Sequence, residues 1–257
     1  MSSHSITSQF FPEVQAGGFT RIDGTIAFYQ RVNALVDKNS VVIDFGAGRG
    51  AGQFDPVSDY RRSLRTLKGK VSKVIGLDVD RAVMTNPSLD EAHVLDERGC
   101  VQLTDGVADL IVSDFTFEHI ADPEGSAREI ERLLKPGGWI CARTPNKFGY
   151  IALGNRLVPE KVKHGVLSTA QPDRLEEDVF PAVYLLNTRA DLLKHFPPAR
   201  FEHFVYGWDA EPGYHANRRS IYRAFLLLHQ FTPPSLKTML MIFIRKRQNQ
   251  PYAEGIK

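Results

Sequence analysis

Hydrophobic and polar positions form a regular block pattern over the first 146 residues. Short apolar runs rich in β-branched residues alternate with longer stretches in which apolar residues recur every three or four positions. This pattern is typical of a parallel sheet that helices cover on both faces. Strands are predicted at Val41–Phe45, Lys73–Asp78, Ala92–Leu95, Asp109–Ser113 and Trp139–Arg143, and helices near 24–37, 57–68, 80–86 and 123–134. We therefore expect a doubly wound α/β fold with a ligand beyond the carboxyl ends of the strands.

The alternation stops after Pro145. Residues 146–187 are rich in Pro, Gly, Asn and charge, and they are too long for an ordinary connection, which predicts a lid or substrate-side insertion. Beyond it the pattern predicts a helix near Arg189–His195, a strand-like run RFEHFVYG, a helix near Arg218–Gln230 and a last strand TMLMIFIRK. The pattern leaves the direction of that last strand open.

The first strand runs into the sequence DFGAGRG, where glycines 46, 48 and 50 follow Asp44. Glycine lets the backbone approach a ligand closely and adopt positive φ. The same letters also satisfy G-x-G-x-x-A, a pyrophosphate-binding pattern. A carboxylate here repels a diphosphate and attracts an ammonium or sulfonium, and Pro56 places the next helix start away from the glycines. The loop therefore favours a cationic ligand.

Asp78 ends the second strand, VIGLD. A carboxylate at this position accepts hydrogen bonds from both hydroxyls of a ribose, in dinucleotide enzymes as well. It can also cap the helix that follows. Asp78 thus indicates an adenosine-type cofactor without choosing one.

Four ordered motifs, DFGAGRG, VIGLDVD, ADLIVSDFTFEHIADP and EIERLLKPGGWICARTPN, resemble those of class I S-adenosylmethionine-dependent methyltransferases of the type-11-like branch. The resemblance covers residues from about 20 to 146, and it is weaker from there to the end of the sequence. It implies a Rossmann-like sheet of about seven strands, mostly parallel with an antiparallel last strand, and S-adenosyl-L-methionine as the cofactor. A nicotinamide-dependent oxidoreductase is the main alternative enzyme, and a cofactor-binding protein without activity is an alternative of another class.

The resemblance also assigns roles to individual positions. It places Asp44 and the backbone of Gly46, Ala47, Gly48 and Gly50 at the methionine part, Asp78 at the ribose, Val79 and Asp96 at the adenine, and Asp114 and Phe115 along the cleft. The sequence after Asp96 departs from the family pattern, which weakens that assignment. The stretch GGFTRIDGTIAFYQRV resembles a segment that closes over the cofactor, with Phe19, Arg21 and Tyr29 as candidate contacts. Tyr29 can equally well pack the helix on the sheet.

Methyl transfer is an in-line displacement, so the protein mainly aligns the nucleophile and excludes water. A protonated acceptor also needs a base, and His119 in FTFEHI is the best candidate, with Glu118 to orient it or to cap a helix. Stabilisation of the loop is the other interpretation of His119. Polar and aromatic residues beyond the core suit a hydroxyl-rich acceptor, although solvated charges and ordinary packing are the simpler interpretation of each: His164, Asp173, Arg174, Glu176, Glu177, Asp178, Tyr184, Asn187, Tyr206, Trp208, Tyr214 and His215.

The tail resembles that of methyltransferases of bacterial surface-polysaccharide pathways. Our hypothesis is therefore O-methylation of a sugar or glycan-linked group, with a non-carbohydrate metabolite as the alternative acceptor. The whole chain is expected to be one domain, in which 1–38 cover the cofactor, 39–146 bind it, 147–187 form the substrate-side insertion and 188–257 complete the sheet.

Composition limits the classes of partner and ligand that the sequence favours. With 32 Lys and Arg against 30 Asp and Glu, the formal net charge is +2, and no D/N-P-P-Y/F tetrapeptide occurs, so a nucleic-acid substrate is not favoured. Cys100 and Cys141 stand apart from other metal ligands, which predicts no metal site and no disulfide. The polar start and the short apolar runs predict a cytoplasmic protein. Arg218, Arg219 and Arg223 beside FLLL suit a contact with anionic lipid or ordinary amphipathic packing.

Overall fold

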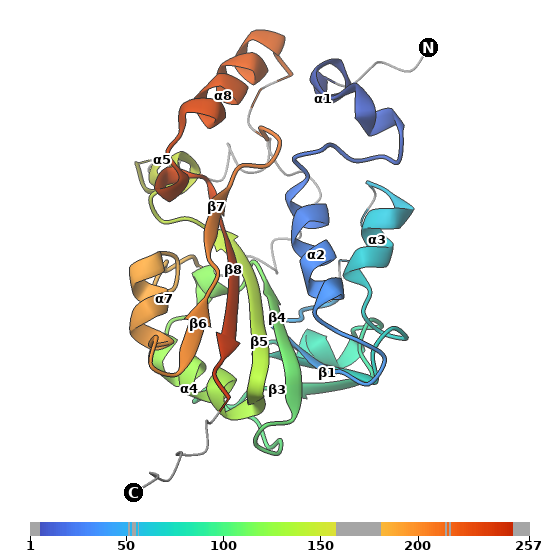
Figure 1. Cartoon of the computed structure of the whole chain (residues 1–257), viewed down its shortest axis with the longest axis vertical. Coiled ribbons are helices and arrows are strands. Elements are labelled where there is room, and N and C mark those ends of the chain that lie inside the picture. The colour runs from blue at the N-terminus through green and yellow to red at the C-terminus, as the bar shows by residue number, and fades with distance from the viewer. Residues whose placement is uncertain are drawn as a thin grey trace, which may run out of the picture.

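The computed structural model describes residues 6–50, 52, 55, 57–157, 181–213, 215 and 217–248. Its centre is an eight-stranded sheet with the order β3-β2-β1-β4-β5-β8-β6, and β7 also pairs with β8 (Figure 1). The strands are β1 Val41–Phe45, β2 Lys73–Asp78, β3 Glu91–Val94, β4 Ala108–Asp114, β5 Leu134–Pro145, β6 Phe201–His203, β7 Tyr206–Trp208 and β8 Met239–Lys246. The predicted doubly wound α/β sheet is confirmed.

β1 to β5 pair in parallel, and the strand order reverses between β1 and β4. Val42, Ile43 and Phe45 of β1 are buried, as expected for a strand covered on both faces. The carboxyl ends of β1, β2 and β4 therefore meet at one edge, where a doubly wound sheet binds its ligand.

β8 is antiparallel to β5 along the register from Trp139↔Arg245 to Pro145↔Met239, as the family resemblance implied. The strand-like run RFEHFVYG forms two short strands, β6 and β7, both antiparallel to β8. Both keep the same register on β8, and the amide of Phe204 between them donates to Phe243 O at 2.8 Å. The sheet thus has one strand more than the expected seven because this edge is interrupted at two residues.

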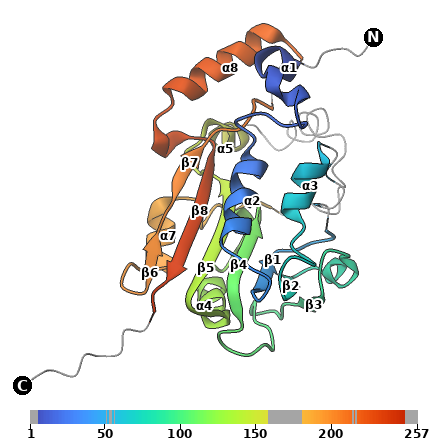
Figure 2. The same ribbon diagram turned by 45° about the vertical axis from the view of Figure 1, so that its right-hand side comes forward.

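Helices cover both faces (Figure 2). α2 Gly24–Ala34 and α3 Asp59–Arg65 lie on one face, where Phe28 and Val32 are fully buried against Val42 and Phe243. α4 Pro123–Leu133 and α7 Arg189–His195 lie on the other, over Ile43 and Phe45. The remaining helices are α1 Ile6–Phe10, α5 Tyr150–Leu157 and α8 Arg219–Phe231, with short 3-10 helices η1 Pro12–Gln15, η3 Arg81–Thr85, η4 Phe117–His119 and η6 Pro234–Leu236.

Side-chain caps fix where these helices begin. Asp23 accepts the amides of Thr25 and Ile26 at 2.8 and 2.9 Å, and Ser58 accepts the amide of Arg61 at the start of α3. The helix expected at 80–86 is instead the 3-10 helix η3, because Pro87 follows at once and disfavours helical backbone at Asn86. No helix in the described ranges is long and apolar enough to cross a membrane.

Candidate active site

A cavity of about 860 Å³ opens at the carboxyl edge of β1, β2 and β4. The structure brings most of the predicted site residues into its wall: Tyr29, Asp44, Gly46, Ala47, Gly48, Gly50, Asp78, Val79, Asp96, Asp114, Phe115 and His119. Phe19, Arg21 and Glu118 do not line it. A single cavity therefore brings together predicted site residues that are up to 90 positions apart in the sequence.

The glycine loop after β1 needs glycine for two different reasons. Gly46, Gly48 and Gly50 all have positive φ, of 83°, 50° and 81°. A Cβ at Gly46 would lie 2.1 Å from Thr116 Oγ1, whereas a Cβ at Gly48 would meet no atom within 4 Å. Gly46 is thus required by internal packing, while the bare backbone of Gly48 faces open space in the cavity wall.

Asn86 holds this loop in place and is a residue that the sequence did not reveal. Its Nδ2 donates to the carbonyls of Ala47 and Gly48 at 3.0 and 3.2 Å. A Cβ at Gly50 would lie 2.3 Å from Asn86 Oδ1. The residue lies just beyond η3, and nothing in its sequence context distinguishes it from a helix end.

Asp78 connects the loop to β2. Its Oδ2 accepts the amide of Gly48 at 2.8 Å, and its Oδ1 accepts the amide of Asp80 at 2.9 Å. Each carboxylate oxygen retains a second lone pair. The carboxylate therefore organises the glycine loop and can still accept ribose hydroxyls from the cavity.

Asp44 is a half-buried acid in the cavity wall. Burial, followed by the nearby carboxylates of Asp114 and Asp78, raises the pKa of Asp44 to about 7. No salt bridge to this carboxyl occurs in the described part of the chain, and Arg65 opposes the shift only in part. A cationic ligand beside this carboxyl would stabilise its ionised form, which the surroundings otherwise disfavour.

Asp114, Arg143 and Asp44 project on the same face of the sheet, beneath α2. They share a face with Val112, Cys141 and Val42, since side chains alternate along a strand. Asp114 and Arg143 are direct partners in the β4–β5 register. Arg143 is 5% exposed, and its Nη2 donates to Asp114 Oδ2 at 2.9 Å.

This ion pair sets the charge of the cavity floor. Burial alone would raise the pKa of Asp114, but Arg143 and then Arg65 outweigh it and hold the pKa below the usual value. Tyr29 donates its hydroxyl to Asp114 Oδ2 at 3.1 Å. Burial, then Asp114 and Asp44, raise the pKa of Tyr29 well above its usual value, so this hydroxyl remains a donor.

Arg65 is a second cation at the cavity and is not among the site residues predicted from the sequence. It comes from the last turn of α3, and its Nη1 lies 3.0 Å from Asp55 Oδ2. Its Nη2 lies 3.9 Å from Asp114 Oδ2. Its Nε is buried without a hydrogen-bond partner in the described structure. A buried donor of this kind is costly unless a ligand satisfies it.

The adenine side of the cavity is more open. The Val79 side chain is 61% exposed. It therefore offers an accessible apolar surface on which a flat ring could pack. Asp96 is exposed, and its Oδ1 accepts the amides of Arg98 and Cys100 at 2.9 and 2.8 Å. Asp96 therefore lines the cavity and shapes the 96–100 turn.

Phe115 has an unusual backbone for a bulky residue. Its φ is 58°, and its side chain is 40% exposed. Arg143 lies 4.8 Å from the centre of its ring. Strained backbone of this kind persists where the surroundings impose it and is concentrated at functional sites.

His119 and Glu118 lie side by side in η4, but only His119 lines the cavity. His119 Nδ1 lies 3.2 Å from the carbonyl of Pro181, and Nε2 lies 4.0 Å from Glu118 Oε1. A carbonyl only accepts, so Nδ1 carries the proton and Nε2 is the basic nitrogen of the neutral ring. Burial raises the pKa of Glu118, whose Oε2 accepts from Thr144 Oγ1 at 2.7 Å.

Residues near the insertion serve mainly as supports. The amides of Val183 and Tyr184 donate to the carbonyl of Glu118 at 2.7 and 3.2 Å. Asn187 is fully buried and donates to Thr144 Oγ1 at 2.7 Å. His164, Asp173, Arg174, Glu176, Glu177, Asp178 and Tyr214 lie outside the described residues.

Unlike Tyr29, the predicted contacts Phe19 and Arg21 do not line the cavity, and neither do Tyr206, Trp208 and His215. Phe19 packs on Tyr60 with 5.5 Å between ring centres, and Arg21 pairs with Glu13 at 3.1 Å. Trp208 Nε1 donates to Ile22 O at 3.2 Å. Tyr206 stacks on Phe243, and His215 packs edge-on against Tyr222. The prediction of Phe19 and Arg21 rests on the resemblance of their segment. At Tyr206, Trp208 and His215 the signal is aromatic character, which packing explains equally well.

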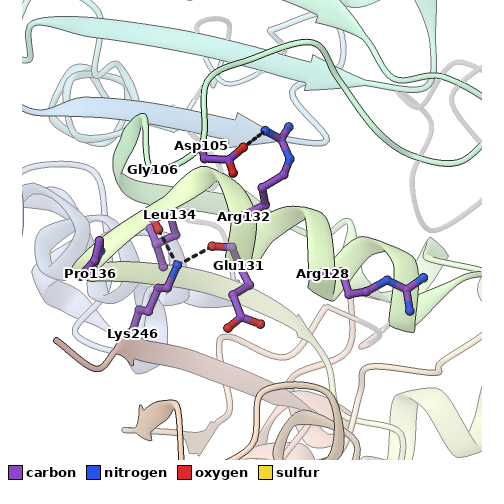
Figure 3. A pocket seen from close by; sticks show the side chains of 8 residues that line it. All are labelled: Asp105, Gly106, Arg128, Glu131, Arg132, Leu134, Pro136 and Lys246. Carbon is purple, nitrogen blue, oxygen red and sulfur yellow. Dashed lines mark hydrogen bonds and ion pairs between the residues drawn. The ribbon is translucent and has the colours of Figure 1, made fainter. Parts of the chain in front are cut away.

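A second cavity, of about 470 Å³, lies at the opposite edge of the sheet (Figure 3). Its cations are satisfied within the protein. Arg132 Nη1 lies 2.6 Å from Asp105 Oδ1, and Lys246 Nζ donates to the carbonyls of Glu131 and Leu134 at 2.7 and 2.9 Å. These charges hold β8 to the end of α4. In the described residues no three His, Cys, Asp or Glu side chains gather as a metal site.

Comparison with known proteins agrees with this geometry. Residues 21–204 match the family described as "Methyltransferase domain". A Mycolicibacterium smegmatis protein named "Probable S-adenosylmethionine-dependent methyltransferase" is 30% identical over 114 residues, which are 42% of this chain and 39% of that protein. The chain thus matches less than two thirds of that relative's length.

Solved structures share the fold. A SAM-dependent methyltransferase from Archaeoglobus fulgidus is 16% identical, with a TM-score of 0.51 over 86% of this chain and 92% of that one. Geranyl diphosphate C-methyltransferase from Streptomyces coelicolor A3(2) is 13% identical, with a TM-score of 0.50 over 86% and 76% of the two chains. At these identities the likeness concerns architecture only.

Proposed function

The chain belongs to the methyltransferase domain family, whose methyl donor is S-adenosylmethionine, and we propose that it transfers this methyl group to a hydroxyl of a sugar or glycan-linked acceptor. The observation that supports the donor site most strongly is the open backbone of Gly48 between the carboxylates of Asp44 and Asp78 in a single cavity.

The cavity residues fit the donor at both of its ends. Asp44 would hold the ammonium of the methionine part, and the guanidinium of Arg65, which lines the same cavity, would serve its carboxylate. Asp78 would accept the ribose hydroxyls, while Val79 and Asp96 would border the adenine. Opposite charges at the two walls suit a zwitterionic amino-acid group.

When bound, the donor supplies an electrophilic methyl carbon on a sulfonium. The chain itself supplies alignment and proton removal. Asp114 is fixed by Arg143 and Tyr29, so the floor of the cavity is rigid beside the reacting atoms. In such a displacement, positioning contributes most of the rate that the protein provides.

His119 is proposed as the base that a hydroxyl acceptor requires. Its Nδ1 is oriented by the Pro181 carbonyl, and Nε2 is the nitrogen that would take up the proton. The imidazolium that forms would lie 4.0 Å from Glu118 Oε1, whose negative charge would stabilise it. Thr116, Asp122 and Ser126 line the same part of the cavity and offer hydrogen bonds to a polyhydroxyl compound.

Incubation with methyl-labelled S-adenosylmethionine and a panel of nucleotide sugars, glycans and non-carbohydrate metabolites tests the acceptor class. We expect label on a sugar hydroxyl. Label on a non-carbohydrate compound alone would reject the carbohydrate acceptor and keep the transferase. Donor binding without transfer to any acceptor or cell extract would instead indicate a non-catalytic binding protein.

The His119→Asn variant tests the base. Its kcat should fall at least about 100-fold, since general bases contribute roughly 10²–10⁴. Thr85→Ala, at an exposed position outside the cavity, is a control for nonspecific effects. Unchanged kcat in His119→Asn would assign this histidine to support of the loop.

A further inference from the structure

α8 is apolar on two faces. On the inner face, Tyr222 is fully buried and stacks on Phe10 of α1 with 5.0 Å between ring centres. His229 is buried, and its Nε2 lies 3.0 Å from the Tyr150 hydroxyl of α5. These contacts fasten the helix to the body of the protein and account for its inner face alone.

The outer face exposes large apolar side chains. Leu227, Leu228 and Phe231 are 48%, 45% and 78% exposed, and Leu236 beyond the helix is 44% exposed. Residues three and four apart lie on one side of a helix, so Leu227, Leu228 and Phe231 share one surface with the exposed Ala224. We call Ala224, Leu227, Leu228 and Phe231 the outer apolar surface. Helix faces that are only solvated are normally polar.

The basic residues of α8 lack acidic neighbours in the sequence. Residues 218–237 contain Arg218, Arg219, Arg223 and Lys237 and no Asp or Glu, and Lys237 is paired with Asp209 at 2.7 Å. Arg218, Arg219 and Arg223 are exposed. None of these three arginines has an ion pair among the described residues. The first two turns of α8 are therefore an uncompensated basic end beside the outer apolar surface.

α8 lies at the same edge of the sheet as the cavity. It leads through η6 to Met239, which pairs with Pro145 at the carboxyl end of β5. Figures 1 and 2 both show α8 beyond this edge, next to α1 and α5. A partner of α8 would therefore lie at the same end of the sheet as the cavity.

We propose that α8 docks on an anionic membrane surface, with the outer apolar surface at the acyl boundary and the three arginines at the lipid phosphates. Interfacial helices combine an apolar face that carries a large aromatic with basic residues beside it. Anionic leaflets attract such cations. The proposal goes beyond methyl transfer and does not depend on the acceptor.

Vesicle flotation of the full-length protein tests the proposal. Vesicles of phosphatidylcholine alone are compared with vesicles containing 30% phosphatidylserine, at low and high salt. The wild type should float with the anionic vesicles and dissociate at high salt. Arg219→Gln and Arg223→Gln should each weaken binding about five-fold, and Phe231→Ser at least about ten-fold.

Arg128→Gln is the matched control, because it removes an exposed arginine of α4 with the same change of charge. It should bind as the wild type does. Thermal unfolding should be unchanged in the α8 variants, since the replaced side chains are exposed. Failure of the wild type to bind anionic vesicles, or equal binding by the α8 variants, would overturn the proposal. Self-association that Phe231→Ser abolishes, without vesicle binding, would assign the surface to an interface between copies and overturn it as well.

Discussion

The carboxyl of Asp44 is held in surroundings that oppose its ionisation. Because burial raises its pKa to about 7 from the ordinary 3.8, the folded protein keeps a proton that the unfolded chain loses. The stability that Asp44 contributes is therefore complete below about pH 4 and is lost as the pH rises through about 7. A cationic ligand would compensate this loss.

Replacement of Asp44 by asparagine should separate stability from binding. The cofactor-free Asp44→Asn protein should unfold a few degrees higher than the wild type, because about 1 kcal/mol shifts Tm by roughly 2–4 °C in a domain of this size. The difference should be larger at pH 8 than at pH 5. Calorimetric scans at both pH values, with the exposed Asp59→Asn as the control, measure it. If the Tm of Asp44→Asn at pH 8 were lower than that of the wild type, the raised pKa of Asp44 would be contradicted.

Gly46 and Gly48 should respond differently to the same substitution. Alanine at either position carries a positive-φ cost of about 1–2 kcal/mol. Gly46→Ala adds a clash with the Thr116 side chain and should therefore unfold at a clearly lower temperature than the wild type. Gly48→Ala brings its Cβ near no protein atom, so it should fold. It should bind S-adenosylhomocysteine about ten-fold more weakly or worse. Thermal scans and calorimetric titration of both variants check this contrast. Normal affinity in Gly48→Ala would mean that no ligand approaches this backbone.

At the scale of elements, β4 and β5 are joined at the site by the Asp114–Arg143 pair as well as by their backbone. Arg143→Met should lower the free energy of unfolding by about 3 kcal/mol, because it leaves the buried carboxylate of Asp114 with only the more distant Arg65 as a cation. Adding Asp114→Asn should restore part of that loss. Urea unfolding of both single variants and the double variant gives the coupling, and additive effects would show that the pair is not coupled.

The strands of the core could be predicted from the sequence because their apolar runs are bounded by Asp and Gly at the sheet edge. The alternation of side chains along a strand also places Asp44, Asp114 and Arg143 on one face of the sheet. The position of Arg143 at the site could therefore have been predicted, because it lies two residues after Cys141 and points to the same face. Arg65 and Asn86 could not, because their roles depend on how α3 and η3 fold back toward the glycine loop. The interruption between β6 and β7 likewise depends on pairing with β8.

At the scale of the molecule, the cavity draws on β1, β2, β4, α2 and α3 together. A ligand that binds only the folded state stabilises all of them, by about 2.7 kcal/mol at one hundred times its Kd. S-adenosylhomocysteine at that concentration should therefore raise Tm by roughly 5–10 °C. NAD should leave Tm unchanged. A shift with NAD alone would favour an oxidoreductase.

The central claim is that Asp44 and the bare backbone after β1 hold the amino-acid end of S-adenosylmethionine. Isothermal titration of S-adenosylmethionine into the wild type and Asp44→Asn at pH 8 tests it most directly. We predict one site per chain in the wild type and affinity at least about ten-fold weaker in the variant, since hydrogen bonds to charged groups contribute roughly 1.5–3 kcal/mol. No heat of binding in the wild type, or equal affinity in both proteins, would contradict the claim.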